Sequence, residues 1–392
     1  MKTTATPTRA QLVGRAADLV PVLAAHAVWQ EENRRLHPEA VDAIADAGLL
    51  RMRTPERYGG YESDMTTVVD VISQVALGDG SAGWTLAVWA ISAWMTGMFP
   101  DETQDEVFGS GDVRISGILS PGAVAAPVPG GVVVNGRWAF NSGALHSTWN
   151  TNAAVLVGEG EPQPVMLMLP LADLQIVDDW HTAGLRGSGS VTTVAADVFV
   201  PERRLLPMGP VLQGRHRSLR NADSAIYNAP FMPTACTTVS APAYGLARAA
   251  RAAFQERLPG RKISYTAYEH QSEAPLTHLQ VAEAAVKADE AGFHVHRAAG
   301  LLDAKTAARE QWTVEERARI RLDMGAACRR AKEAVDVLSL ASGGSSVYRD
   351  VPIQRIARDI QTVNLHSILH PDTNDELYGR IACGLEPNTL FL

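Results

Sequence analysis

Two histidines near the carboxyl end have a spacing that suggests metal chemistry. His366 and His370 stand at i and i+4 in a helix predicted from about Ile353 to Leu369, and this spacing places two imidazoles on one helical face, as a metal pair requires. Ser367 occupies the position at which a metalloprotease would carry its glutamate, and the sequence shows no third ligand. The pair alone is therefore weak support for a metal centre.

Other reactive side chains show no familiar catalytic spacing. The sequence contains no G-x-S-x-G, P-loop, G-x-G-x-x-G or H-E-x-x-H pattern. His294 and His296 are two residues apart on a predicted helix, so they point to different sides and are interpreted as ordinary helical histidines. Cys236, Cys328 and Cys383 lie far apart without a C-x-x-C, which agrees with a reducing compartment. We therefore predict no metal site.

Length and composition limit the class of protein. The chain has 392 residues, 46% of them hydrophobic and 20% charged, which is typical of a large globular enzyme or binding protein with two or three domains. Its 35 basic and 43 acidic residues give a net charge of −8, which would repel the phosphate backbone of a nucleic acid and argues against general nucleic-acid binding. No apolar stretch resembling a signal peptide precedes the first predicted helix, so we expect a cytoplasmic protein.

An uncharged run of 21 residues extends from Gly80 to Pro100. By length it could span a bilayer, but acidic residues flank it and no Lys or Arg stands nearby. Its tryptophans Trp84, Trp89 and Trp94 are five positions apart and fall on different helical faces. We therefore predict a helix that is buried in protein and does not cross a membrane.

Periodicity divides the chain into three parts. Residues 1–112 read as helical, with a capping box of Thr8 and Gln11 and with Pro38 in the first turn of a second helix. Residues 113–206 contain short β-rich runs that predict a small antiparallel barrel or sandwich, and residues 207–392 predict an antiparallel bundle of four helices. The fold class is α+β, mainly α. The expected strands cover residues 115–119, 132–140, 153–157, 165–169, 174–177 and 191–200, and the expected bundle helices cover residues 235–257, 277–302, 314–341 and 353–369.

Two polar, glycine-containing segments in the middle part stand out. Asn135-Gly-Arg-Trp-Ala-Phe-Asn-Ser-Gly143 is a strand with a polar end, and Gly184-Leu-Arg-Gly-Ser-Gly-Ser190 is a loop leading into a strand. Each segment taken alone has the composition of a hairpin end. Their order within a helix, sheet, helix layout suggests a more specific role.

These segments resemble motifs of the acyl-CoA dehydrogenase superfamily. Pro55-Glu-Arg-Tyr-Gly-Gly60 resembles its "P-x-x-Y-G-G" turn, and Asn135 to Gly143 resembles the strand whose Thr bonds flavin, with Phe140 at the Trp position and Ser142 at the Thr position. Gly184 to Ser190 followed by Asp197-Val-Phe-Val-Pro201 resembles "G-x-R-G-S/T-x-S" leading to "D-V-x-V-P". The resemblance implies an N-terminal helical domain, a central antiparallel β-barrel and a C-terminal four-helix bundle.

Departures from the dehydrogenase pattern indicate one branch of the superfamily. Where the dehydrogenases commonly carry a glutamate that removes the substrate α-proton, this chain has Leu365-His-Ser-Ile-Leu-His370. A histidine there, with "W-x-F-x-S-G" and "G-L-R-G-S/T-G-S", is similar to the two-component, group D flavin monooxygenases. Some members carry a second histidine in the uncharged helix, where this chain has Ser92 and Met95.

The resemblance implies roles for particular residues. Ser142 would place a hydroxyl against the flavin N5, and His366 would supply or retain the proton that makes the transferred oxygen electrophilic. The residues expected to contact the cofactor are Ser116, Ser120, Phe140, Asn141, Ser142, Arg186, Ser188, Arg261 and Arg358. Those expected to face the substrate are Ser92, Trp94, Met95 and His370.

The resemblance also implies cofactors and partners. A separate NAD(P)H-dependent reductase would supply reduced FAD, or alternatively FMN, which reacts with O2 to a flavin C4a-hydroperoxide, and the protein would form a homodimer or homotetramer. An apolar pocket without a basic cluster favours a small aromatic substrate, phenolic or indole-like, over a CoA thioester. The alternatives are an acyl-CoA dehydrogenase or oxidase with a relocated base, and an N- or S-oxygenating member of the family.

Overall fold

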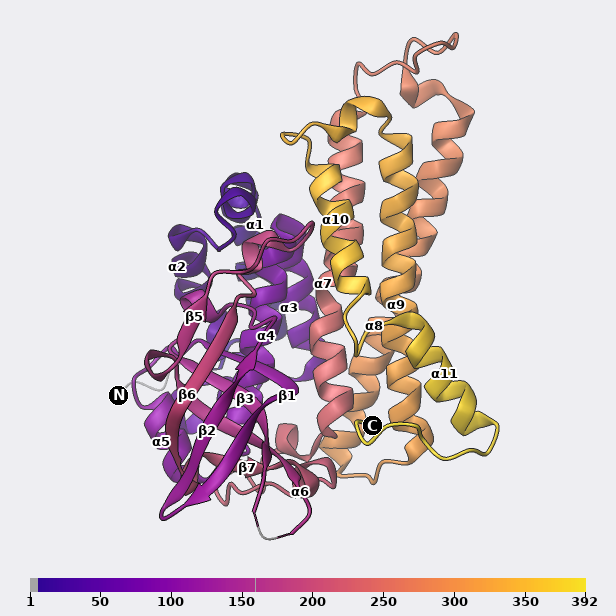
Figure 1. Cartoon of the computed structure of the whole chain (residues 1–392). Helices are drawn as coiled ribbons and strands as arrows, with labels where there is room; N and C mark the ends of the chain where they lie inside the picture. The colour runs from indigo at the N-terminus through magenta and orange to yellow at the C-terminus, as the bar shows by residue number, and fades with distance from the viewer. Residues whose placement is uncertain (1–5, 159) are drawn as a thin grey trace.

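The amino-terminal part is a group of packed helices. The computed structural model describes residues 6–158 and 160–392. Its first helices are α1 (Arg9–Asn33), α2 (Pro38–Asp46), α3 (Met65–Gly78), α4 (Gly80–Thr96) and α5 (Asp101–Phe108) (Figure 1). The capping box of Thr8 and Gln11 is confirmed, as is Pro38 in the first turn of α2. Local capping chemistry thus sets where these helices begin.

The uncharged run forms α4, and every residue of this helix except Ile91 is buried. Asp79 precedes the helix and its carboxylate accepts a hydrogen bond from the Ala82 N–H at 2.8 Å. Pro100 closes the run and caps α5. The predicted burial is therefore confirmed, and α4 packs against α3, α7 and the sheet. Of the helices in the described ranges, α1 alone has the length and hydropathy of a membrane span, and it packs against α3.

The middle of the chain forms one mixed sheet of seven strands. In spatial order they are β5 (Gln175–Val177), β6 (Thr192–Pro201), β2 (Gly131–Trp138), β1 (Ile115–Val128), β3 (Trp149–Leu156), β4 (Gln163–Pro170) and β7 (Leu205–Pro207). The predicted strands are all present, although β1 is much longer than expected.

The predicted antiparallel barrel is wrong in two respects. β1 and β3 run parallel, with Ile115 opposite Trp149, because the chain after β2 crosses back to the beginning of β1 before β3 starts. The sheet is also open, since β5 and β7 pair with one neighbour each and not with one another. Its ribbon is strongly twisted (Figure 1).

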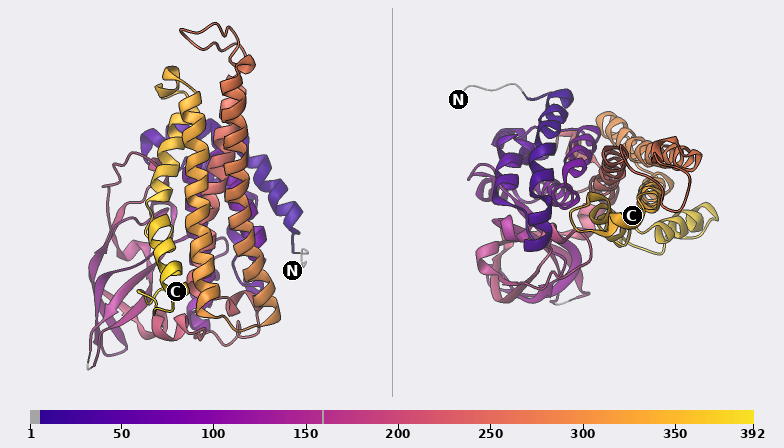
Figure 2. Two further views of the ribbon diagram at one scale, coloured as in Figure 1. Left: turned by 90° about the vertical axis from the view of Figure 1, so that its right-hand side faces the viewer. Right: turned by 90° about the horizontal axis from the view of Figure 1, so that it is seen from above.

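Long helices return after the sheet and a connecting segment that includes α6 (Met208–Leu212). They are α7 (Phe231–Arg257), α8 (Pro275–Ala308), α9 (Val314–Ala341) and α10 (Pro352–Asn364), followed by α11 (Pro371–Ala382). α7 to α10 lie side by side, with α7 also covering α3 and α4 (Figure 2). The largest hydrophobic cluster joins these helices to the amino-terminal ones, while a second cluster lies within the sheet around Val134, Trp138 and Leu167.

Candidate active site

A continuous chain of hydrogen bonds joins the two polar segments that the sequence singles out. The Trp84 indole N–H donates to Ser142 Oγ at 2.9 Å, and Ser142 Oγ lies 2.7 Å from Ser190 Oγ. Ser190 Oγ is in turn 2.7 Å from Ser188 Oγ, which donates to the Leu185 carbonyl at 2.7 Å. Helix α4, the end of β2 and the loop before β6 are thereby held together at buried hydroxyls.

The backbone around Ser142 has unusual conformations that the glycine pattern partly predicts. Gly143 has a φ of +74°, and a Cβ there would lie only 2.7 Å from Trp89 Nε1. Phe140 also has a positive φ, +64°, which is strained for a residue with a side chain. Phe140 is 68% exposed, and its ring meets that of Trp180 edge-on with the ring centroids 5.9 Å apart. An exposed aromatic ring beside buried hydroxyls is suited to covering a flat ligand.

His366 lies in a turn, which corrects the predicted helical pair. Helix α10 ends at Asn364, residues 365–369 form turns, and His370 precedes α11. Pro371 begins α11, and a proline disfavours helical backbone in the residue before it, so one helix cannot carry both histidines. The spacing of a metal pair is therefore absent.

The surroundings of His366 keep its imidazole neutral. Its ring centroid lies 5.2 Å from that of Trp84, so Trp84 contacts both His366 and Ser142. Burial lowers the pKa of His366 to about 4. Its Nδ1 is buried without a hydrogen-bond partner in the described part of the chain, as is Nδ1 of His370. A neutral imidazole offers one donor and one acceptor to a ligand.

Buried amides and hydroxyls line the strands beside Ser142. Asn141 donates to Asn150 Oδ1 and to Thr193 Oγ1 at 2.8 Å, and Asn150 donates to Ser116 Oγ. Several neighbouring polar atoms are buried without a partner among the described residues. These atoms are Thr85 Oγ1, Asn141 Oδ1, Thr151 Oγ1 and Asn152 Oδ1.

Such orphaned polar atoms are rare in folded proteins, because each costs desolvation energy. A flat heterocycle with its own N–H and carbonyl groups, such as a flavin ring, would supply partners, so this set of hydroxyls and amide oxygens fits the implied cofactor. Of these residues, Thr85, Thr151 and Asn152 were missed from the sequence, as were Ser190 and the bridging role of Trp84. The sequence feature that could have pointed to Trp84 and Thr85 is their position in the uncharged run.

Arg186 and Arg358 lie together at the edge of a cavity of about 590 Å³. Arg186 Nε donates to the Glu31 carbonyl at 3.0 Å, and Arg358 forms a 2.5 Å ion pair with the Glu31 carboxylate. Arg358 also donates to the Ala183 carbonyl at 2.6 Å. Both cations are therefore anchored by local acceptors while facing a cavity large enough for part of a cofactor.

A buried carboxyl fixes the loop that ends the serine chain. Asp359 on α10 accepts a 2.6 Å hydrogen bond from the Leu185 N–H. Burial and the nearby Asp79 raise the pKa of Asp359 to about 7. This contact connects α10 directly to the loop that carries Arg186 and Ser188.

The other predicted site residues are more scattered. Ser92 is buried on α4 against Gly117 of β1, next to Ser116, and Met95 is buried one turn further along. Trp94 is instead directed to the connection before α7, where its N–H donates to the Ile226 carbonyl at 2.9 Å.

Two predicted cofactor residues lie apart from the serine chain. Arg261 lies between α7 and α8, and its guanidinium donates to the Ser342 carbonyl, the one hydrogen bond of this side chain among the described residues. Ser120 is exposed on β1. This single copy therefore does not bring either residue to Ser142.

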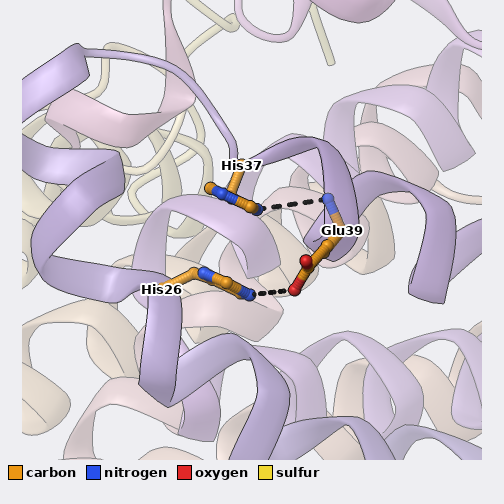
Figure 3. Close-up of side chains that lie close together, drawn as sticks. All are labelled: His26, His37 and Glu39. Carbon is orange, nitrogen blue, oxygen red and sulfur yellow. Dashed lines mark hydrogen bonds and ion pairs between the residues drawn. The ribbon is translucent and has the colours of Figure 1, made fainter.

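A separate group of potential metal ligands is better explained as a helix cap. His26, His37 and Glu39 approach within 4.8 Å of one another (Figure 3). His26 Nε2 lies 2.8 Å from the Glu39 carboxylate, and His37 Nδ1 accepts the Glu39 N–H at 3.2 Å at the start of α2. The two rings are stacked in parallel at 3.9 Å, so their lone pairs do not converge on a common point.

The chain is similar to known proteins over nearly its full length. The acyl-CoA dehydrogenase N-terminal domain family matches residues 15–108, and the C-terminal domain family matches residues 237–371. The chain is 31% identical over 369 residues to the flavin-dependent monooxygenase oxygenase subunit HsaA of Rhodococcus jostii, covering 94% of this chain and 97% of that protein. It is 29% identical to the oxygenase component of the FADH2-dependent resorcinol hydroxylase of Rhizobium sp., covering 96% of this chain.

A solved structure gives the same result for the fold. XiaF from Streptomyces sp., in complex with FADH2 and glycerol, superposes with a TM-score of 0.91 at 30% identity, covering 97% of each chain. The helix, sheet, helix architecture of this chain is thus accompanied by similarity over nearly the full length. The chain belongs to the acyl-CoA dehydrogenase superfamily and, within it, to the oxygenase components of two-component flavin-dependent monooxygenases.

Proposed function

We propose that this monooxygenase hydroxylates a small phenolic or indole-like aromatic compound, using O2 and reduced FAD, or alternatively FMN, from a separate NAD(P)H-dependent reductase. The observation that carries the proposal is that Trp84 contacts both Ser142 and His366 at a group of orphaned buried polar atoms. Bound reduced flavin would supply the electrons with which one oxygen atom of O2 enters the substrate and the other leaves as water.

The residues proposed to hold the flavin ring belong to the β2 end and the neighbouring strands. Asn141 and Ser116 belong to one hydrogen-bonded group, Ser142 presents a hydroxyl, and the exposed Phe140 ring would cover the ring system. Ser188 fixes the adjacent loop. Arg186 and Arg358, which face the larger cavity, are suited to an anionic portion of the cofactor.

His366 would act on the substrate as a neutral base. Because its pKa is about 4, the imidazole carries a free lone pair at neutral pH. That lone pair can accept a hydrogen bond from a phenol O–H or an indole N–H, which increases the electron density of the aromatic ring, and can take the proton once attack on the electrophilic oxygen has made it more acidic. This role differs from proton donation by an imidazolium, which burial disfavours.

The substrate class is supported by the residues near the site. α4 contributes an apolar helix with Ser92 and Met95 beyond Trp84. His370, whose buried Nδ1 has no partner among the described residues, is proposed to face the same substrate. An uncharged aromatic compound with one polar group suits such surroundings better than a CoA thioester, whose phosphates require cations. The Rhizobium relative is named for resorcinol, a compound of this chemical class.

Assembly and location are part of the same proposal. Arg261 lies apart from the serine chain within one copy, which supports a homodimer or homotetramer in which it reaches the cofactor of another subunit. Cys236 and Cys328 are buried free thiols, in keeping with a cytoplasmic setting.

The test is a reconstituted reaction. The protein, a flavin reductase, NADH, FAD and O2 are mixed with a panel of phenols, indoles and acyl-CoA thioesters, and hydroxylated product is measured against hydrogen peroxide. We expect hydroxylation of at least one phenol or indole. Hydrogen peroxide alone across all phenols and indoles, or bleaching of oxidised flavin by an acyl-CoA without oxygen, would contradict the proposal.

A further inference from the structure

A second cavity, of about 290 Å³, lies near Trp94, whose ring contacts the lining residue Arg53. It is formed by the start of α3, the end of α8, the start of α7 and the short 3-10 helix η7 (Ala225–Asn228) that precedes α7. None of its lining residues comes from the sheet, from the Ser142 segment or from the His366 turn. Its volume is close to the lower end of the range for ligand pockets.

A buried arginine faces this cavity and forms no direct ion pair with a carboxylate of the described residues. Arg53 is only 3% exposed, and its guanidinium lies 5.6 Å from the centre of the Trp94 ring. It donates one hydrogen bond, to the Ser63 carbonyl at 2.6 Å, and no carboxylate of the described residues is within ion-pair distance. A guanidinium has five N–H donors, so most of its donor capacity is unused.

Two threonine hydroxyls in the same cavity also have no partner. Thr234 on α7 and Thr306 on α8 are buried, and the Oγ1 atom of each makes no hydrogen bond within the described chain. Buried hydroxyls normally find a partner, because an unpaired one costs desolvation energy. Together with Arg53 they form a polar surface that lacks a hydrogen-bonding ligand.

The acidic residues around the cavity are already engaged. Asp303 accepts the Met65 and Thr66 N–H groups at 2.6 and 2.9 Å, and Asp64 accepts the Thr67 N–H at 2.7 Å. These carboxylates, with that of Glu62, give the lining a net negative charge that opposes an anionic ligand.

Apolar side chains complete the wall, and the cavity reaches the surface. Met65, Ile226 and Leu302 supply apolar contact area, and the exposed residues Ala225 and Ala307 lie at the rim. We propose that this cavity is a second ligand site, separate from the candidate active site, for a small uncharged compound that has an apolar body and a hydroxyl or carbonyl oxygen. The oxygen accepts from Arg53 and pairs with the threonine hydroxyls.

The test is a binding titration of the flavin-free full-length protein with 4-fluorophenol, followed by fluorine NMR. A ligand of this size is expected to bind with a Kd of roughly 1 mM. Ala225→Trp and Ala307→Trp, which place a large ring at the rim, should each weaken binding by at least about tenfold. Thr306→Val should weaken it by roughly three- to tenfold through loss of one hydrogen bond.

The control variant is Ala308→Trp, which changes an exposed alanine next to the rim that does not line the cavity. It should bind as the unchanged protein does. The proposal is overturned if no binding is detected, or if both rim variants bind 4-fluorophenol as tightly as Ala308→Trp. Because the candidate active site is itself proposed to take a phenol, the second site is measured as the binding that the rim variants lose relative to Ala308→Trp, and hydroxylation assays of the same variants test the active site separately.

Discussion

Two tryptophan–serine pairs lie five residues apart along α4 and differ in what surrounds them. Trp84 donates to Ser142 at 2.9 Å, and Trp89 donates to Ser147 at 3.1 Å. Ser147 then donates to the nearby Gly143 carbonyl at 2.8 Å, so the hydrogen bonds of this pair do not reach another part of the chain. Ser142 instead continues to the loop at Ser190, and its tryptophan contacts His366. The same pair of residue types thus has only local hydrogen bonds at one position and belongs to the candidate active site at the other.

The two pairs have the same residue types and differ in how far their hydrogen bonds extend through the protein. The Trp84 pair is linked through buried hydroxyls to Leu185, and Asp359 holds the Leu185 N–H from α10. Three separate parts of the chain therefore depend on one another at this pair, whereas the Trp89 pair joins only α4 to the turn after β2. Substitutions at the two pairs should have different consequences for catalysis and similar consequences for stability.

The largest effect is expected from His366→Asn. Removing the base should lower the rate of product formation by about a hundredfold, because positioned general bases contribute roughly 10²–10⁴-fold. His278→Asn, at an exposed histidine in α8, serves as the control and should retain full activity. Initial rates of product formation with the reductase in excess measure both. An unchanged rate in His366→Asn would show that the contact of Trp84 with His366 has no catalytic role, and it would contradict the proposed difference between the Trp84 and Trp89 pairs.

Asp359→Asn should remove a pH dependence of stability. The pKa of Asp359 is raised from 3.8 to about 7 by burial, so the folded state favours its protonated form. Its contribution to stability is complete below about pH 4 and declines as pH rises toward 7. The asparagine variant should therefore gain about 3 kcal/mol relative to the unchanged protein between pH 4.5 and pH 7.5. Urea unfolding at both pH values measures this gain, and a constant difference would contradict it.

Trp84→Phe and Trp89→Phe should each cost about 1 kcal/mol of unfolding free energy, because each removes one indole hydrogen bond from a buried serine. Only Trp84→Phe should reduce the fraction of NADH that is used for hydroxylation. Chemical denaturation and a coupling assay on both variants sharpen the comparison. Equal loss of coupling in the two variants would show that both pairs belong to the site.

Much of the fold could be predicted because its signals are local. The capping box at Thr8 and the uncharged composition of α4 depend on neighbouring residues, and α9 begins and ends at the predicted residues. The sheet topology depends on which strands pair although they are far apart in the sequence. The parallel pairing of β1 with β3 therefore had no signature in a single strand, and the predicted antiparallel barrel is wrong.

The site was predictable where glycines and serines form a motif and was missed where contacts are long-range. Ser142 and Ser188 lie in the segments that the sequence singles out, and the structure joins them through Ser190. Thr85 and Asn152 carry no pattern of their own, because only the packing of α4 on the sheet makes their polar atoms buried and unpartnered. The helical pairing of His366 with His370 failed because Pro371 starts a new helix.

The most direct test of the account compares Ser142→Ala with Ser147→Ala. The ratio of hydroxylated product to NADH consumed is measured for both, together with the hydrogen peroxide released. The account predicts that Ser142→Ala diverts most of the reducing equivalents to hydrogen peroxide, while Ser147→Ala keeps the ratio of the unchanged protein. Unchanged coupling in Ser142→Ala, or the same loss in both variants, would contradict the claim that the Trp84 pair forms the reactive site.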